Sequence, residues 1–325
     1  MEKIKFLTMA ALATAFFASC SNEDGLPQSN YPADNVVRIT TSVDGMNTRA
    51  SYGGSTAKLS SFGFCINNAG SDKYTYDNIK VTQENGKWNP ATQMLWQNST
   101  TAVDILAYAP YQANGNVKIF GKSDYAFSVK EDQSNAEDYS SDLIVYKQTG
   151  FKPESDLNTN QAVNVAFTHL LSQLNLTIEL RDQFNQDEKK PVTEATVTDV
   201  KVNGTIISSK VDFSASPISV QVDDTQEATA ITPETTEFKA AGKTTDHAAF
   251  NYSAIVIPQT VTAGNFSISF KVDGTDYIWT STSDVNFVSG NKHQLSLLVG
   301  KDVVQVKGIT ATPWGKENIT QGETD

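Results

Sequence analysis

Residues 163–180 read VNVAFTHLLSQLNLTIEL, and this stretch decides the fold. In its first half, every second position is apolar, at Val163, Val165 and Phe167. The same period returns in its second half, at Leu174, Leu176, Ile178 and Leu180. Because successive side chains of a β-strand point to opposite faces, a period of two predicts two strands that each bury one face. Residues 169–172, between them, are a candidate for one helical turn.

The same alternation recurs on both sides of this stretch. Further candidate strands lie at 37–43, 59–66, 76–81, 103–108, 125–129, 143–146, 218–222, 266–272, 294–299 and 303–312. Nowhere does an apolar stripe of helical period persist for three turns, and residues 223–248 are rich in Thr and acidic residues, which predicts a long loop. We therefore expect an all-β fold built from antiparallel β-sandwiches with little helix.

The length of the chain predicts two domains. Of the 325 residues, about 300 remain after the targeting segment, and single cores stop growing near that size. Residues 151–161 have few apolar side chains, as expected of a linker. We therefore place a signal peptide at 1–19, a tether at 20–35, an N-terminal β-sandwich at 36–150, the linker at 151–161 and a C-terminal β-sandwich at 162–325.

The N-terminus has the features of a lipoprotein signal. Two lysines at positions 3 and 5 precede an apolar stretch, residues 6–17, that is too short to span a bilayer. Phe17-Ala18-Ser19-Cys20 then resembles a bacterial lipobox, which predicts cleavage between Ser19 and Cys20 and acylation of the Cys20 thiol, as with palmitate. An ordinary secretory signal with an incidental cysteine is the alternative. We expect an outer-membrane lipoprotein exposed at the cell surface, held to the membrane by its lipid.

Charge and residue content argue against several classes of function. The net charge of −12 disfavours nucleic acid as a partner. The three histidines fall in no metal-binding or catalytic motif, so we expect no metal, no cofactor and no enzymatic activity. His169 is predicted to be a hydrogen-bonded corner residue at a strand end. Cys65 lies among alternating apolar residues and is predicted to be a buried hydrophobe without a disulfide partner.

Aromatic side chains are concentrated between residues 88 and 111. Trp88 and Trp96 have the chemistry to stack on sugar rings, which makes them candidate glycan contacts. The other interpretation is that they pack within the sandwich or cover it.

Several short motifs, in order, resemble the fimbrillin family of Gram-negative anaerobes. After the lipobox come Asn47-Thr48-Arg49-Ala50, Leu59 to Phe64, the pair Trp88 and Trp96, Val103 to Tyr111, Ser141 to Val145, Val165 to Leu174, Val256 to Thr260, Phe287 to Asn291, and Ile309 to Trp314. None of these motifs is specific alone, but their joint order spans nearly the whole chain.

This resemblance implies two transthyretin-like Greek-key β-sandwiches and a role in a pilus, or fimbrium. It implies that a surface protease cuts between Arg49 and Ala50, and that the strand holding Val37, Ile39 and Val43 then leaves. A C-terminal strand of another subunit would fill the vacated groove, and the candidate donor residues here are Val304, Val306 and Ile309. The implied partners are other fimbrial subunits, together with surface glycans or proteins in adhesion.

Three alternatives remain open at this level. Arg49 can be an ordinary loop arginine, and the family includes stalk, anchor and tip components that the motifs do not separate. A lipid-anchored carbohydrate-binding protein that does not polymerise is the competing function.

Overall fold

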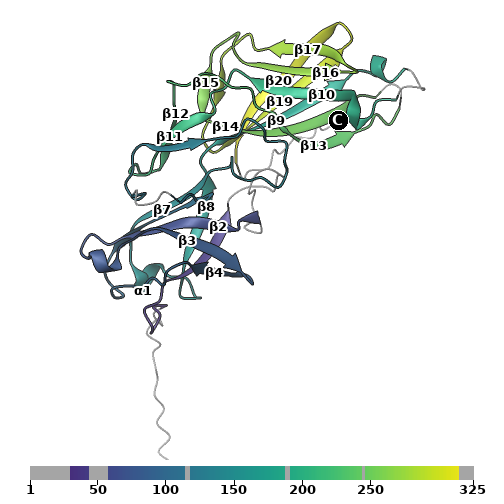
Figure 1. Cartoon of the computed structure of the whole chain (residues 1–325). Coiled ribbons are helices and arrows are strands. Elements are labelled where there is room, and N and C mark those ends of the chain that lie inside the picture. The colour runs from purple at the N-terminus through teal and green to yellow at the C-terminus, as the bar shows by residue number, and fades with distance from the viewer. Residues whose placement is uncertain (1–29, 44–57, 114–117, 187–190, 244–245, 315–325) are drawn as a thin grey trace, which may run out of the picture.

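The computed structural model describes residues 30–43, 58–113, 118–186, 191–243 and 246–314. These residues form β-strands, one short α-helix (α1, Pro153–Asp156) and 3-10 turns at Asp72–Tyr74, Asp182–Phe184 and Glu194–Thr196. The fold is elongated, with the early strands at one end and the later strands at the other (Figure 1). The predicted all-β class is confirmed. The signal peptide, Ser19, Cys20, Arg49 and Ala50 lie outside the described residues.

A seven-stranded sheet forms the N-terminal end of the molecule. Its strands, in spatial order, are β1 (Arg38–Val43), β8 (Ala162–His169), β7 (Ile144–Phe151), β5 (Val103–Ala109), β2 (Ser61–Asn67), β3 (Tyr76–Glu84) and β4 (Lys87–Pro90). All pairings in it are antiparallel except that of β1 with β8, which is parallel. The expectation of purely antiparallel sheets was therefore wrong at this edge, because β1 and β8 are far apart in sequence and no hairpin fixes their direction.

The middle of this sheet is buried on both faces, which explains its sequence. Strand β5 reads VDILAYA, a nearly continuous apolar run, as expected of a strand with no solvated face. Ile105 and Ala107 belong to the core inside the seven-stranded sheet, whereas Leu106 and Tyr108 belong to a second core on its other face. The two cores of the molecule therefore share this sheet as a common wall.

A five-stranded sheet organises the C-terminal end. Its order is β13 (Glu234–Lys239), β14 (Ala248–Val256), β9 (Ser172–Leu180), β19 (Asn291–Gly300) and β20 (Val303–Pro313). The alternating side chains of β9 at Leu174, Leu176, Ile178 and Leu180 are all buried, as the sequence period predicts. Strands β9 and β19 run parallel, and the remaining pairs are antiparallel.

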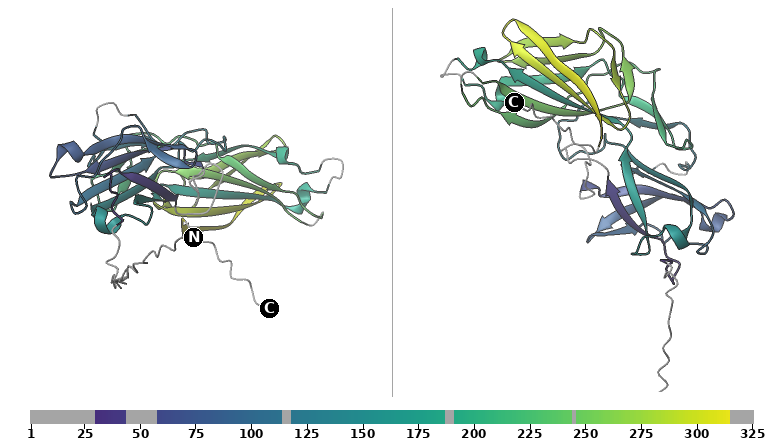
Figure 2. Two further views of the ribbon diagram at one scale, coloured as in Figure 1. Left: turned by 90° about the horizontal axis from the view of Figure 1, so that it is seen from below. Right: turned by 180° about the vertical axis from the view of Figure 1, so that it is seen from behind.

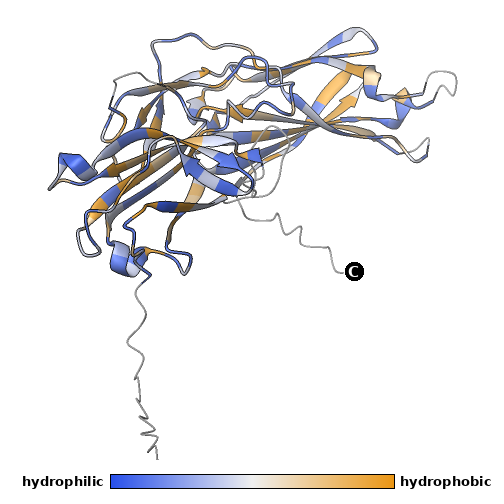
Figure 3. Cartoon of the chain, turned by 60° about the horizontal axis from the view of Figure 1, so that its bottom comes forward, coloured by the Kyte–Doolittle hydropathy of each residue, from blue (hydrophilic) through white to orange (hydrophobic). Residues whose placement is uncertain are grey.

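Three small sheets complete the C-terminal end (Figure 2). They consist of β10 (Val197–Asn203), β16 (Ser267–Val272) and β17 (Thr275–Thr280); of β12 (Ser219–Val222), β11 (Ser208–Asp212) and β6 (Tyr125–Ser128); and of β15 (Gln259–Val261) with β18 (Val285–Phe287). Colouring by hydropathy shows apolar and polar residues alternating along many strands (Figure 3).

The structure corrects two local predictions and shows what the predicted linker contains. Residues 169–172 form no helical turn, because β8 ends at His169 and β9 begins at Ser172. The predicted long loop at 223–248 contains β13, an edge strand whose mostly polar sequence, ETTEFK, gives little apolar signal. The predicted linker contains the end of β7 and helix α1.

The division of the chain into domains at 151–161 stays a prediction. Strands from either side of this boundary pair with each other. Strand β8, which follows it, joins the seven-stranded sheet of earlier strands, and β6, which precedes it, pairs with β11.

A close approach between β2 and β5 yields a first testable prediction. Gly63 lies opposite Tyr108, and a Cβ atom at position 63 would lie 2.3 Å from the Tyr108 ring. The ring is fully buried, and its hydroxyl donates to Asn78 Oδ1 at 2.7 Å. Gly63→Ala should lower the free energy of unfolding by about 1–3 kcal/mol, because the overpacked ring has no free space. Denaturant unfolding measures this loss. Gly70→Ala is the control, because its nearest contact would be an ordinary 3.5 Å, and an equal loss in both variants would contradict the prediction.

Candidate functional site

Strand β1 is an edge strand that closes one core. Among the described strands it pairs with β8 alone, from Arg38 opposite Ala162 to Val43 opposite Phe167. Its apolar side chains point inward, and Val37, Ile39 and Val43 are only 3%, 7% and 8% exposed. The segment before it is tied down by Val37 N–H donating to Met94 O at 3.0 Å. The strand predicted to leave is therefore docked on the sheet, with its apolar face in the core.

One inward position of β1 is not apolar. Thr41 lies between Ile39 and Val43 on the same face, and its Oγ1 is buried without a hydrogen-bond partner among the described residues. A buried hydroxyl without a partner costs about 1–3 kcal/mol. The packing of β1 against the core therefore includes one unfavourable contact.

The seven-stranded sheet curls so that its two edges face each other. Strand β1 and strand β4, at opposite ends of the strand order, line one hollow of about 820 Å³. Residues 36–41, in and just before β1, line this hollow, and Trp88 of β4 lies along it. The edge next to β1 is therefore accessible and is not closed by another strand of the described chain.

The two tryptophans predicted as glycan contacts lie in different environments. Trp96 is buried and stacks on Phe151, with ring centres 5.6 Å apart, so the prediction of a glycan contact does not fit Trp96. Trp88 is half-buried, and its ring packs edge-on against Phe62 at 5.0 Å. Packing thus accounts for Trp96 and for one edge of Trp88, whose exposed part lines the hollow.

Strand β20 is the second edge strand of interest. In the described part of the chain it pairs only with β19, through an antiparallel hairpin in which Lys307 is an extra residue between Val306 and Gly308. Val303, Val306 and Ile309 are 44%, 46% and 41% exposed, among the largest exposures of apolar side chains in the described chain.

The register of β20 puts its three candidate donor residues on one face. Val304, Val306 and Ile309 lie opposite Val299, Leu297 and Leu295, which are buried in the C-terminal core. Residues directly opposite each other share a face of the sheet, so all three candidate donor residues point to the core side. The bulge at Lys307 keeps Ile309 on that face, where a regular strand would turn it away. Val306 and Ile309 nevertheless remain uncovered, because the strand lies at the margin of the core.

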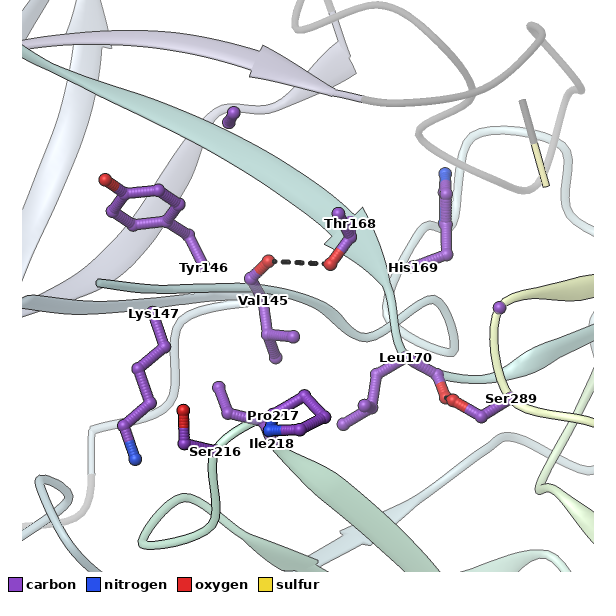
Figure 4. Close-up of a pocket in the computed structure, with 12 residues that line it drawn as sticks. Val145, Tyr146, Lys147, Thr168, His169, Leu170, Ser216, Pro217, Ile218 and Ser289 are labelled. Atoms are coloured by element: carbon purple, nitrogen blue, oxygen red, sulfur yellow. Dashed lines mark hydrogen bonds between the residues drawn. The ribbon is translucent and has the colours of Figure 1, made fainter. Parts of the chain in front are cut away.

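The junction between the two ends of the molecule holds a second hollow, of about 390 Å³ (Figure 4). Lys147 of β7 lies at its margin, and its ammonium group donates to the carbonyl oxygens of Phe213, Ser214 and Ala215 at 2.8, 2.9 and 2.8 Å. Burial lowers the pKa of Lys147. The three carbonyl groups still hold the charged form, so this lysine fastens β7 to the loop that follows β11.

His169, His293 and Cys65 have the buried, hydrogen-bonded environments of structural residues. His169 Nδ1 lies 2.9 Å from Asp142 Oδ1, as expected of a corner residue. His293 Nε2 accepts from Val288 N–H at 3.1 Å, and burial lowers its pKa. Cys65 is buried, and this burial raises the pKa of its thiol, which makes it a poor nucleophile. The described residues hold no cluster of three or more His, Cys, Asp or Glu side chains suited to a metal, and none of their helices could cross a bilayer.

These features define a structural β-sheet protein whose distinctive parts are two unequal edge strands. The fimbrillin-like family model matches residues 48–314. The chain belongs to the fimbrillin-like family, which confirms the resemblance seen in the sequence. This is a family of structural adhesion proteins associated with the cell surface and fimbriae, and not of enzymes.

Solved structures agree with this assignment at the level of fold. A candidate cell adhesion protein from Bacteroides ovatus has a TM-score of 0.61 at 13% identity, over 87% of this chain and 99% of that one. Another from Bacteroides uniformis has a TM-score of 0.53 at 19% identity, over 86% and 100% of the two chains. A fimbrial protein from Bacteroides vulgatus has a TM-score of 0.51 at 16% identity, over 85% and 99%. No curated protein matches the sequence.

The unpaired hydroxyl of Thr41 yields a second prediction. Thr41→Val should raise the free energy of unfolding by about 1 kcal/mol, because it replaces a buried, unsatisfied hydroxyl with a methyl group of similar shape. Thr40→Val is the matched control, since the Thr40 hydroxyl donates to Val163 O at 3.3 Å and accepts from Asn158 Nδ2 at 3.0 Å. The control should lose stability. Chemical denaturation compares the two, and destabilisation by both variants would show that Thr41 is well satisfied.

Proposed function

We propose that this protein is a fimbrial subunit, or an accessory or tip component of a fimbrium, that joins its neighbours by donor-strand exchange and mediates adhesion. One observation carries the proposal. Strand β1 covers a core with buried apolar side chains but is held by one neighbour, whereas β20 directs apolar side chains toward a core that does not cover them. The first edge supplies a groove, and the second supplies a strand with the chemistry to fill it.

The acceptor is the groove beneath β1. Removal of β1 would expose the unpaired backbone edge of β8 and the apolar sites now filled by Val37, Ile39 and Val43. Both kinds of exposure are unfavourable, and an added strand removes both at once. Each large aliphatic side chain buried there contributes about 1.5–3 kcal/mol, so three anchors make a durable joint.

The donor is β20 of another copy or of a related subunit. Val304, Val306 and Ile309 share a face because of the bulge at Lys307, so the strand can present all three to a groove if it keeps this bulge. Much of the Val306 and Ile309 surface is in water before exchange and would be buried after it. The favourable free energy of assembly therefore comes from burying apolar surface that is exposed in the free subunit.

Processing and anchoring complete the proposal. Cleavage between Arg49 and Ala50 would free β1 from the rest of the chain, and acylation at Cys20 would tether the uncut form to the outer membrane.

The processing step gives a third prediction. An Arg-specific protease should convert the purified chain into a form that starts at Ala50, loses β1 and assembles into polymers. N-terminal sequencing, size-exclusion chromatography and negative-stain microscopy follow these three events. Arg49→Lys keeps the charge but removes the cleavage site, and should remain monomeric. A cleaved chain that retains β1 and stays a stable monomer would overturn the proposal.

The donor face gives a fourth prediction. Ile309→Glu should reduce polymer formation by the cleaved chain at least tenfold, because a carboxylate would have to enter an apolar groove. Thr310→Glu is the matched control: it adds the same charge at the next residue, which points to the other face of β20. Both positions are exposed in the free subunit, so both variants should fold. Equal polymerisation by the two variants, measured by light scattering, would exclude this face of β20 as the donor surface.

A lipid-anchored carbohydrate-binding protein that does not polymerise is the second candidate function. It is supported by the position of Trp88, which lines the hollow beside β1 together with polar side chains such as Asn89 and Gln83. Glycan-array binding that is lost in Trp88→Ala, by a chain that stays monomeric after cleavage, would favour this function.

A further inference from the structure

Three residues from distant parts of the sequence meet where the two ends of the molecule join. Asp142 precedes β7, His169 ends β8, and Trp314 directly follows β20. The His169 and Trp314 rings are stacked, with centres 3.8 Å apart and planes within 5° of parallel. Each of the three belongs to a short motif that the sequence comparison identified, but the sequence assigned no joint role to them.

Trp314 anchors an otherwise exposed strand. Its side chain is buried, whereas most residues of β20 before it are exposed. Its backbone N–H donates to Gly290 O at 2.7 Å, and the Lys292 ammonium lies 5.8 Å from the centre of its ring. The main apolar attachment at this end of the strand is therefore one residue beyond the strand itself.

The surface that receives Trp314 is rigid. The His169 and Asp142 side chains are almost completely buried, and the bond between them orients the imidazole ring. The adjacent backbone is held as well, since Leu170 N–H donates to Leu143 O at 2.9 Å and Ser289 Oγ donates to Leu170 O at 2.6 Å. Figure 4 shows His169 and Ser289 near Leu170 at this junction. The two rings contact each other through their faces. Their nitrogens His169 Nε2 and Trp314 Nε1 have no hydrogen-bond partner in the described part of the chain.

The topology of the hairpin means that Trp314 lies at the end from which β20 can separate from β19. Strand β20 is joined to β19 by a tight turn at residues 301–302, so it is covalently held at that end. It can peel away from β19 only from the other end, where Trp314 is docked. An edge strand with exposed side chains opens at low cost unless a contact at its free end prevents it.

We propose that the stack of Trp314 on His169, oriented by Asp142, is a latch that retains β20 on its own subunit until the strand is donated. The latch rests on the proposed function only in the identity of β20 as the donor. The contact that must break first is then the ring stack, and the strand peels toward the turn once it is broken. The latch keeps the apolar face of β20 from pairing with other chains before assembly, which is a hazard for any exposed edge strand.

Hydrogen exchange of the uncut monomer tests the latch without any need for polymerisation. Trp314→Ala should accelerate exchange of the β20 amides that bond to β19 at least tenfold, while amides of β13, at the opposite edge of the same sheet, change less than threefold. Trp314→Phe keeps a ring that can stack and should restore most of the protection. His169→Ala removes the other ring and should reproduce the effect of Trp314→Ala.

A matched control removes an aromatic ring from the opposite edge. Phe238 of β13 packs on Phe250 with ring centres 4.8 Å apart, so Phe238→Ala should accelerate exchange in β13 and leave β20 protected. Equal acceleration of β9, β13 and β20 in Trp314→Ala would mean that Trp314 is an ordinary core residue, and would overturn the latch. Unchanged exchange in β20 would overturn it too.

A second measurement separates the latch from the proposed function. The polymerisation rate of the protease-treated chain should rise at least threefold in Trp314→Ala if peeling of β20 limits assembly. Selective loosening of β20 in the monomer, with no polymer from any cleaved variant, would retain the latch and reject donor-strand exchange. A slower rate in Trp314→Ala, with β20 loosened, would show that Trp314 acts in the assembled joint and would overturn its role as a latch.

Discussion

The structure depends on how the backbone edges of its sheets are satisfied. Strand β8 has β7 on one side and only β1 on the other, and β1 is attached by parallel pairing rather than by a hairpin. Its inward side chains complete the core of the seven-stranded sheet, so edge pairing and core burial are supplied by the same six residues. A segment that performs both tasks, and is not part of a hairpin, can in principle be replaced by another strand.

The two edges differ in what they lack. At β1, the core is covered, and the uncommitted groups are the backbone edge beside the hollow and the buried hydroxyl of Thr41. At β20, the backbone is paired with β19, and the uncommitted groups are the apolar side chains of Val306 and Ile309. In the proposed strand exchange, β20 of one copy would take the place of β1 in the next, which would join copies of one chain end to end.

The junction between the two ends ties these edges together. His169 ends the strand on which β1 docks, and Trp314 follows the strand proposed as donor, so their stack joins the acceptor side of the molecule to its donor side. Lys147 adds a separate attachment through the carbonyl groups of the loop after β11. These contacts add to the core that packs on the outer face of the seven-stranded sheet, which also fixes the relative position of the two edges.

The sequence by itself determined the β class, most of the long strands and the family, because a period of two and short motifs are local signals. It also marked Val37, Ile39 and Val43 as one apolar face, and the structure buries all three. It did not show that β1 pairs in parallel with β8, that β6 joins β11, or that β13 is a strand. Strands β6 and β11 pair through residues 80 positions apart in the chain, such as Ser128 and Ser208, and no local pattern encodes such a pairing. The meeting of Asp142, His169 and Trp314 was likewise decided only by the tertiary structure, since each residue on its own had an ordinary polar or aromatic role.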